Sequence, residues 1–219
     1  VSEERLGEIF RELIAQGAQN INLVSPTPFV PAIKRVLERE NLQVPVVYNC
    51  SGYETVETVR ALDGLVDIYL PDLKYISPAL SERYSGAEDY FEAASRAVRE
   101  MCRQTGPPVY DEEGRMLFGT LVRHLILPSH AEESKAVLRW CRESLPEGTP
   151  VSVMAQYLPC GRAAEFPELN RRIAKSEYNA VLDELFSLGL DGYVQERSAA
   201  KKEYIPPFDL SGVEKKQGH

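Results

Sequence analysis

Two hydrophobic periods alternate along this chain, and this alternation restricts its fold more than any other feature. Apolar residues spaced three and four apart, as in residues 6–14, predict amphipathic helices. Short continuous apolar runs closed by turn residues predict buried strands at 21–24, 44–48, 66–70, 120–127 and 151–157. Strands that alternate with helices favour a parallel sheet with right-handed crossovers. The sequence therefore predicts an α/β fold, either an open doubly wound sheet or a partial or full β/α barrel.

The length and the turn signals predict one main domain. A chain of 219 residues suits one α/β domain better than two small ones. The turn at residues 111–114 predicts a small hairpin, and the last helical pattern stops near Gly189. After Tyr193 the sequence becomes polar. We expect a β/α domain over residues 1–190 and a C-terminal extension or tail over residues 191–219.

Composition excludes several classes of partner. The net charge of −8 argues against a long nucleic-acid or anionic-membrane footprint. No run approaches the roughly 20 apolar residues of a membrane helix. None of the four cysteines forms a C-x-x-C pair, and a cytoplasmic protein with reduced thiols is the simplest interpretation. The chain begins at Val1 rather than at Met, so we expect a fragment of a longer protein.

The predicted strand at residues 66–70 ends in an acid and a base that share one face. Asp72 and Lys74 lie two residues apart, which is the side-chain period of a strand. In parallel α/β folds, ligands bind at the carboxyl ends of the strands. The pair is therefore either a polar clamp for a charged small molecule or a structural ion pair at the rim of the sheet.

Polar side chains also mark the ends of the other predicted strands. They are Ser25 and Thr27, Asn49 and Ser51, and Gln156 with Tyr157, while Arg123 and His124 lie within the fourth predicted strand, on opposite faces. Thr27 could instead be a helix N-cap, residues 49–52 an ordinary turn, and His124 a hydrogen-bonded core histidine. Arg123 inside an apolar strand needs an anionic or carbonyl partner, because its guanidinium does not lose its charge.

Several common motifs are missing from the sequence. There is no G-x-G-x-x-G, no G-x-x-x-x-G-K-[ST], no G-x-S-x-G and no H-E-x-x-H. Nucleotide sites of the Rossmann or P-loop type, serine-hydrolase chemistry and zinc-protease chemistry are therefore disfavoured. From the strand-end residues alone, the sequence predicts a small polar or zwitterionic ligand.

Five ordered stretches resemble a known family. The chain is similar to the radical S-adenosylmethionine (SAM) proteins, in the branch related to pyruvate formate-lyase-activating enzymes. The resemblance covers residues 1 to about 190. The stretches that carry it are NINLVSPTPF at 20–29, VVYNCSGY at 46–53, VDIYLPDLKY at 66–75, LVRHLILP at 121–128 and PELNRR at 167–172.

This resemblance implies a partial barrel of parallel strands, with about five strands present of a usual six. It also implies SAM and a 4Fe-4S cluster held by a C-x-x-x-C-x-x-C loop after the first strand. That loop is absent from this sequence, so we expect no cluster ligands in this chain and cluster cysteines upstream of Val1. The chain would then be the larger part of an enzyme that reductively cleaves SAM to a 5′-deoxyadenosyl radical for hydrogen abstraction, and it would be inactive alone.

The resemblance also implies roles for individual residues. Asn49 and Ser51 match polar positions near SAM, and Asp72 with Lys74 matches an Asp-x-Lys. Arg123 matches an arginine that contacts the SAM carboxylate or ribose. Two places depart from the family: Ser25 and Thr27 stand where a Gly-Gly-Glu motif is expected, and Gln156 stands near a histidine position. The expected SAM-binding set is Ser25, Thr27, Asn49, Ser51, Asp72, Lys74, Arg123 and Gln156.

Two other readings stay open. One is a cluster-free β/α protein that binds a small ligand or a partner. The other is a metal-independent lyase or aldolase barrel with Lys74 as a Schiff-base amine, which the neighbouring Asp72 disfavours because it keeps the amine charged. If the chain belongs to a radical SAM enzyme, the resemblance to the activating-enzyme branch also implies a glycyl-radical-type protein substrate and an electron donor as partners.

Overall fold

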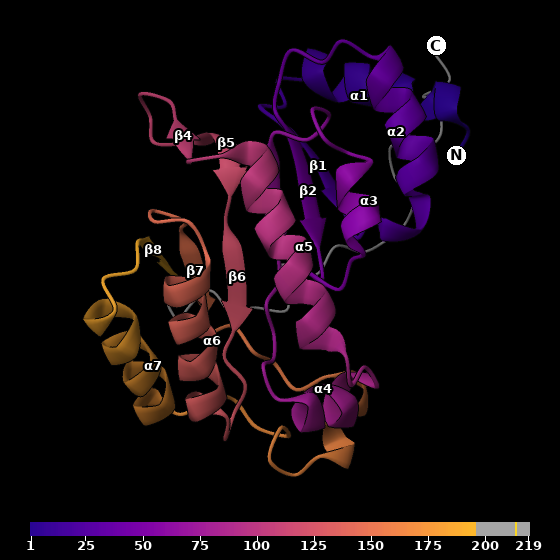
Figure 1. Ribbon diagram of the computed structural model, residues 1–219. Helices are drawn as coiled ribbons and strands as arrows, with labels where there is room; N and C mark the ends of the chain where they lie inside the picture. The colour runs from indigo at the N-terminus through magenta and orange to yellow at the C-terminus, as the bar shows by residue number, and fades with distance from the viewer. Residues whose placement is uncertain (196–212, 214–219) are drawn as a thin grey trace.

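The computed structural model describes residues 1–195 and residue 213, and it consists of alternating helices and strands (Figure 1). The elements, in chain order, are α1 (Glu3–Ala15), β1 (Ile21–Val24), η1 (Thr27–Phe29), α2 (Val30–Arg39), β2 (Val46–Cys50), α3 (Val56–Arg60), β3 (Ile68–Pro71), α4 (Pro78–Ser85), α5 (Tyr90–Thr105), β4 (Val109–Tyr110), β5 (Met116–Thr120), β6 (Val122–Leu125), α6 (Ala131–Ser144), β7 (Val151–Met154), η2 (Gly161–Glu165), α7 (Lys175–Ser187) and β8 (Gly192–Gln195).

The strands form two sheets that meet at the end of β3. One sheet has the order β1-β2-β3-β5-β4 and the other the order β6-β7-β8. Every pair is parallel except the β4–β5 hairpin. Asp72 pairs with Arg123 across the junction, and the Leu73 N–H donates to the Arg123 carbonyl at 2.8 Å. Because β5 and β6 follow one another along β3, the parallel strands form one layer from β1 to β8.

This layer is an open partial barrel in the described residues. No ladder of hydrogen bonds joins β1 to β8 there, so these two strands are its edges. The α/β class and the parallel sheet predicted from the sequence are confirmed. In Figure 1, α5 runs through the middle of the molecule, with α1 and α2 on one side of it and α6 and α7 on the other.

The helices cover one face of the sheet. Val36 and Phe10 of the first two helices pack with Leu23, Tyr48 and Tyr69 of β1 to β3. A second apolar cluster joins α5, α6 and α7 to β6 and β7. Along β1, buried and exposed residues alternate, with residues 21 and 23 buried and residues 22 and 24 exposed. The opposite face of β1 is therefore uncovered in the described residues.

Local sequence explains where several elements begin and end. The Ser77 hydroxyl accepts from the Leu80 N–H, and Pro78 occupies the first turn of α4, where its missing N–H costs no hydrogen bond. Gly86 ends that helix in the left-handed conformation, which glycine adopts without steric strain. Helix α7 ends at Ser187, just before Gly189, as the sequence predicts.

Three expectations can be compared with the strands. The predicted hairpin is confirmed as β4–β5. The single strand expected at 120–127 is two strands, β5 and β6, that break at Leu121. Strand β8 was not expected, and it extends the sheet beyond residue 190 by pairing with β7. Apart from residue 213, the rest of the expected tail lies outside the described residues.

Candidate functional site

Seven of the eight predicted site residues lie at or just beyond the carboxyl ends of β1, β2, β3 and β7. Arg123 is the second residue of β6, where it pairs with Asp72 beyond the end of β3. Because these strands are parallel, their carboxyl ends meet at one edge of the layer. Side-chain contacts join only some of the eight residues.

Asp72, Lys74 and Arg123 form one charged cluster. The Arg123 Nη2 donates to Asp72 Oδ1 at 2.7 Å, and the Lys74 Nζ lies 3.8 Å from Asp72 Oδ2. The side chains of Asp72, Arg123 and Lys74 are 20%, 24% and 40% exposed. One carboxylate thus faces two cations, and the cluster carries a formal charge of +1.

The Arg123 side chain has unused donor capacity. Its Nε–H is buried and has no hydrogen-bond partner in the described part of the chain. A buried donor without an acceptor costs about 1–3 kcal/mol, so such groups call for a ligand or a water molecule. Together with the excess positive charge, this donor makes the cluster suited to an anion such as a carboxylate.

His124 lies on the opposite face of β6 and is fully buried. Its Nδ1 donates to the Leu73 carbonyl at 2.7 Å, since a carbonyl oxygen only accepts. Burial lowers the pKa of His124, so the ring is neutral. This is the hydrogen-bonded core histidine weighed in the sequence, and it anchors the backbone between Asp72 and Lys74.

Ser25 and Asn49 are linked through the backbone. The Ser25 N–H donates to the Asn49 carbonyl at 2.8 Å, which extends the β1–β2 ladder by one bond. Ser25 has a φ of 52°, a left-handed conformation that is uncommon for a residue other than glycine. Such strain is frequent at ligand sites because the surrounding structure must hold it in place.

Ser51 belongs to a loop that touches the loop after β3. Gly52 has a φ of 78°, and a Cβ atom there would lie 2.0 Å from the Asp72 carbonyl oxygen. Only glycine allows this approach. The Tyr90 hydroxyl lies 2.9 Å from the Ser51 carbonyl and 2.9 Å from the Asp72 carbonyl. The two loops therefore meet through backbone atoms, while the Ser51 side chain stays exposed.

Thr27 leads to an acid that the sequence reading missed. The Thr27 hydroxyl donates to the carboxylate of Glu54, which is only 3% exposed. Burial raises the pKa of the Glu54 carboxyl above its usual range. Its Oε2 and the buried Tyr48 hydroxyl have no hydrogen-bond partner among the described residues. A carboxyl group in the loop after a predicted strand was the available signal.

Gln156 is the least connected of the predicted residues. It follows β7, its side chain is exposed, and its amide nitrogen lies 3.6 Å from the Met154 sulfur. Sulfur is a weak acceptor, so this contact does little to hold the side chain.

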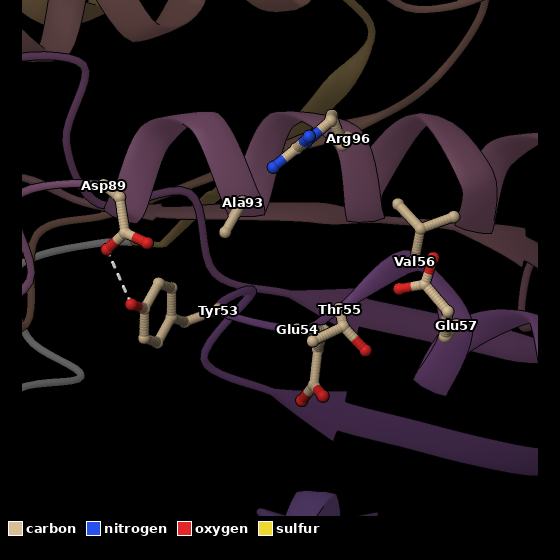
Figure 2. A pocket seen from close by; sticks show the side chains of 8 residues that line it. All are labelled: Tyr53, Glu54, Thr55, Val56, Glu57, Asp89, Ala93 and Arg96. Carbon is tan, nitrogen blue, oxygen red and sulfur yellow. Dashed lines mark hydrogen bonds between the residues drawn. The ribbon is translucent and has the colours of Figure 1, made fainter.

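Two cavities lie away from the charged cluster. One, of about 380 Å³, lies between α5 and the segment from Tyr53 to Glu57. Figure 2 shows Tyr53 bonded to Asp89, with Arg96 reaching from α5. The other, of about 360 Å³, is lined by residues of β1, β2, β3 and β8, by Leu121, by the loops before β1 and β2, and by the β4–β5 hairpin. Neither is lined by Asp72, Lys74 or Arg123.

The cysteines offer no cluster site in the described residues. Cys50, Cys102 and Cys141 are buried and Cys160 is exposed, and no three His, Cys, Asp or Glu side chains gather as metal ligands there. Burial raises the pKa of the Cys50 thiol to about 12, which opposes the thiolate that metal binding needs. In the same part of the chain, no helix is long and apolar enough to cross a membrane.

One curated relative shares sequence with most of the chain. It is an uncharacterized protein of Methanocaldococcus jannaschii, MJ0674, which is 31% identical over 177 residues. The match covers 80% of this chain and 48% of the relative, so the chain spans about half of that protein's length. No family model matches the sequence.

Solved structures share the fold at low sequence identity. A domain of a pyruvate-formate lyase-activating enzyme from Bacteroides vulgatus has a TM-score of 0.58 and 13% identity, covering 81% of this chain and 98% of that chain. SuiB from Streptococcus suis has a TM-score of 0.60 and 14% identity, covering 94% of this chain and 46% of its own. Methylornithine synthase, PylB, has a TM-score of 0.56 and 14% identity, covering 95% of this chain and 68% of its own. The chain therefore shares the fold of these three proteins, which is a radical SAM-like fold.

Proposed function

We propose that this chain is the SAM-binding part of a radical SAM enzyme. The observation that carries the proposal is the cluster of Asp72, Lys74 and Arg123. It has excess positive charge and an unused buried donor, and it lies just beyond the carboxyl end of β3 in a chain with a radical SAM-like fold. SAM presents a carboxylate and an amino group on one side of its sulfonium, so it is a zwitterionic ligand of the kind that the residues predict.

Arg123 and Lys74 are the groups that we assign to the SAM carboxylate. The guanidinium can offer its free Nε–H, and the half-exposed Lys74 ammonium can turn towards the ligand. Asp72 then has a positioning role, because it holds the guanidinium in place through a bond of 2.7 Å. Asp72 by itself would repel the SAM carboxylate, but the two cations that face Asp72 outweigh its negative charge.

The other expected residues supply neutral polar contacts in the proposal. Asn49 and Ser51 lie at the neighbouring strand end, and Gln156 lies on the far side of Arg123 along the layer. The segment around Ser25 and Thr27 has no carboxylate for the SAM amino group. Glu54 lies behind Thr27 and bonds to it, so we assign it a positioning role for that hydroxyl.

The iron–sulfur cluster does not fit the residues of this chain. No ligand set gathers in the described residues, and the sequence has no C-x-x-x-C-x-x-C loop. In the proposal this chain is the larger part of a longer protein, and the cluster belongs to the remainder of that protein. The match to the Methanocaldococcus relative covers 48% of that relative, which supports the existence of a longer protein. The cluster would supply the electron that cleaves SAM to methionine and a 5′-deoxyadenosyl radical.

We further propose an activity and a location for the longer protein, which we call the parent protein. The activating-enzyme domain among the similar structures supports glycyl-radical formation on a protein substrate, with a separate electron donor, as the activity of the parent protein. A cytoplasmic location fits the reduced cysteines.

The test uses the parent protein. After anaerobic reconstitution and dithionite reduction, SAM should be converted to 5′-deoxyadenosine, and the isolated 219-residue chain should form none. A parent protein with a fully assembled cluster that neither binds SAM nor forms 5′-deoxyadenosine would refute the proposal. It would then favour the alternative, a cluster-free β/α protein that binds another small ligand.

A further inference from the structure

Tyr90 joins two strand-end loops through one hydroxyl group. It is the first residue of α5 and is 3% exposed. Its hydroxyl lies 2.9 Å from the Ser51 carbonyl and 2.9 Å from the Asp72 carbonyl, and the Lys74 N–H donates to it at 3.1 Å. One group therefore contacts the backbone on both sides of Leu73 and the loop that follows β2.

The chemistry of a hydroxyl makes this arrangement demanding. A phenol has one proton to donate and can accept from the Lys74 N–H with a lone pair. The two carbonyls of Ser51 and Asp72 share the single proton, which keeps both within reach of one oxygen. Burial raises the pKa of Tyr90, so the hydroxyl keeps this proton at neutral pH.

The same two loops are pressed together next to this hydroxyl. The Cβ position of Gly52 would lie 2.0 Å from the Asp72 carbonyl oxygen and 3.4 Å from the Tyr90 hydroxyl. A spacing this tight is set by backbone atoms. The Asp72 N–H donates to the Cys50 carbonyl at 3.0 Å, and the Tyr90 hydroxyl adds further hydrogen bonds between the same two segments.

We propose that Tyr90 is a positioning residue for the ligand site, and this inference rests on the proposed function. It touches no ligand. It sets the separation between Asn49 and Ser51 on one loop and Asp72 and Lys74 on the other, so that both loops contact the same SAM molecule. Preorganisation of this kind raises affinity because no free energy of binding is spent on ordering the two loops.

The experiment compares Tyr90→Phe with Tyr75→Phe in the parent protein. Tyr75 is a matched control because it is also buried, at 6% exposure, and packs edge-on against Tyr90 at 5.6 Å, but its hydroxyl bonds to the Ser85 side chain. At a temperature where melting curves show all proteins folded, Tyr90→Phe should raise the SAM Kd about tenfold, the equivalent of one lost hydrogen-bonding group. Tyr75→Phe should leave the Kd within about twofold of the unmodified protein.

A second measurement separates positioning from general destabilisation. Amide hydrogen exchange of Lys74 should become faster in Tyr90→Phe and stay unchanged in Tyr75→Phe, because only the first loses the acceptor of that N–H. If Tyr90→Phe does not fold, Gly52→Ala pushes the same loops apart from the other side and should weaken SAM binding in the same way.

The outcomes separate this inference from the proposed function. If the unmodified parent protein does not bind SAM, the proposed function fails and this inference fails with it. If the parent protein binds SAM and Tyr90→Phe binds it as tightly as Tyr75→Phe does, the proposed function stands and the positioning role of Tyr90 is refuted.

Discussion

Arg123→Gln tests the charged cluster most directly. The substitution leaves a shorter polar side chain and removes the guanidinium together with its positive charge. In the structure the guanidinium bonds to Asp72 at 2.7 Å and is about three-quarters buried, with 24% of the side chain exposed. A hydrogen bond to a charged group contributes about 1.5–3 kcal/mol. If Arg123 holds the SAM carboxylate, the SAM Kd should therefore rise about ten- to hundredfold.

The assay is equilibrium dialysis of SAM and of 5′-methylthioadenosine against the reconstituted parent protein. The second compound keeps the adenosine but has no carboxylate. Arg123→Gln should raise the Kd for SAM but change the Kd for 5′-methylthioadenosine by no more than about twofold, because the substitution removes a contact that only SAM makes.

Arg139→Gln is the matched control for Arg123→Gln. Arg139 bonds to Glu184 at the same distance of 2.7 Å, but the pair joins α6 to α7 and the arginine is 48% exposed. Its loss should cost at most about 1 kcal/mol of stability and leave SAM binding unchanged. Equal losses for both ligands in Arg123→Gln, or an unchanged Kd for SAM, would show that Arg123 does not hold the carboxylate.

Three further substitutions test other parts of the site. Lys74→Ala should raise the SAM Kd less than Arg123→Gln does, because the Lys74 ammonium is more exposed. The iron content of the parent protein should stay the same, and an unaltered Kd would remove Lys74 from the site. Gly52→Ala should lower the free energy of unfolding, measured in urea, by more than Gly64→Ala does. Gly64 is the control because its φ of 77° is close to the 78° of Gly52, while no atom lies within 4 Å of its Cβ position. Equal losses of stability would mean that Gly52 and the Asp72 carbonyl are not in close contact. Burial raises the pKa of Glu54 above the ordinary 4.5, so the folded state binds the proton more tightly than the unfolded state does. In urea titrations, the unmodified protein should therefore lose stability relative to Glu54→Gln as the pH rises above 4.5. A stability difference that does not change with pH would show that Glu54 is not desolvated.

Neighbours along the chain were the easiest part of the site to predict. Asp72 and Lys74 lie two residues apart at a strand end, and the structure places them in one ion pair because strand geometry sends both side chains to the same face. The hairpin at β4–β5 was also readable, since its turn chemistry lies within a few adjacent residues.

Contacts between distant residues could not be read in the same way. Arg123 was expected to need an anionic or carbonyl partner, but Asp72 as that partner lies 51 residues away and is selected by the register between β3 and β6. Glu54 was missed because its burial depends on the packing of η1 against the loop after β2. Strand β8 was missed because four residues with little apolar character have no signal until β7 offers them a partner.

The sequence by itself determined the class of this protein. Its alternating periods specify helices on a parallel sheet, and parallel strands bring the polar residues at their carboxyl ends to one edge. Only the tertiary structure decided which of those residues meet. It brought Asp72, Lys74 and Arg123 into one cluster, left Gln156 apart from it, and tied two loops to Tyr90. The physical reason is that strand periodicity acts over a few residues, whereas register, burial and hydrogen bonding between loops depend on the whole packed layer.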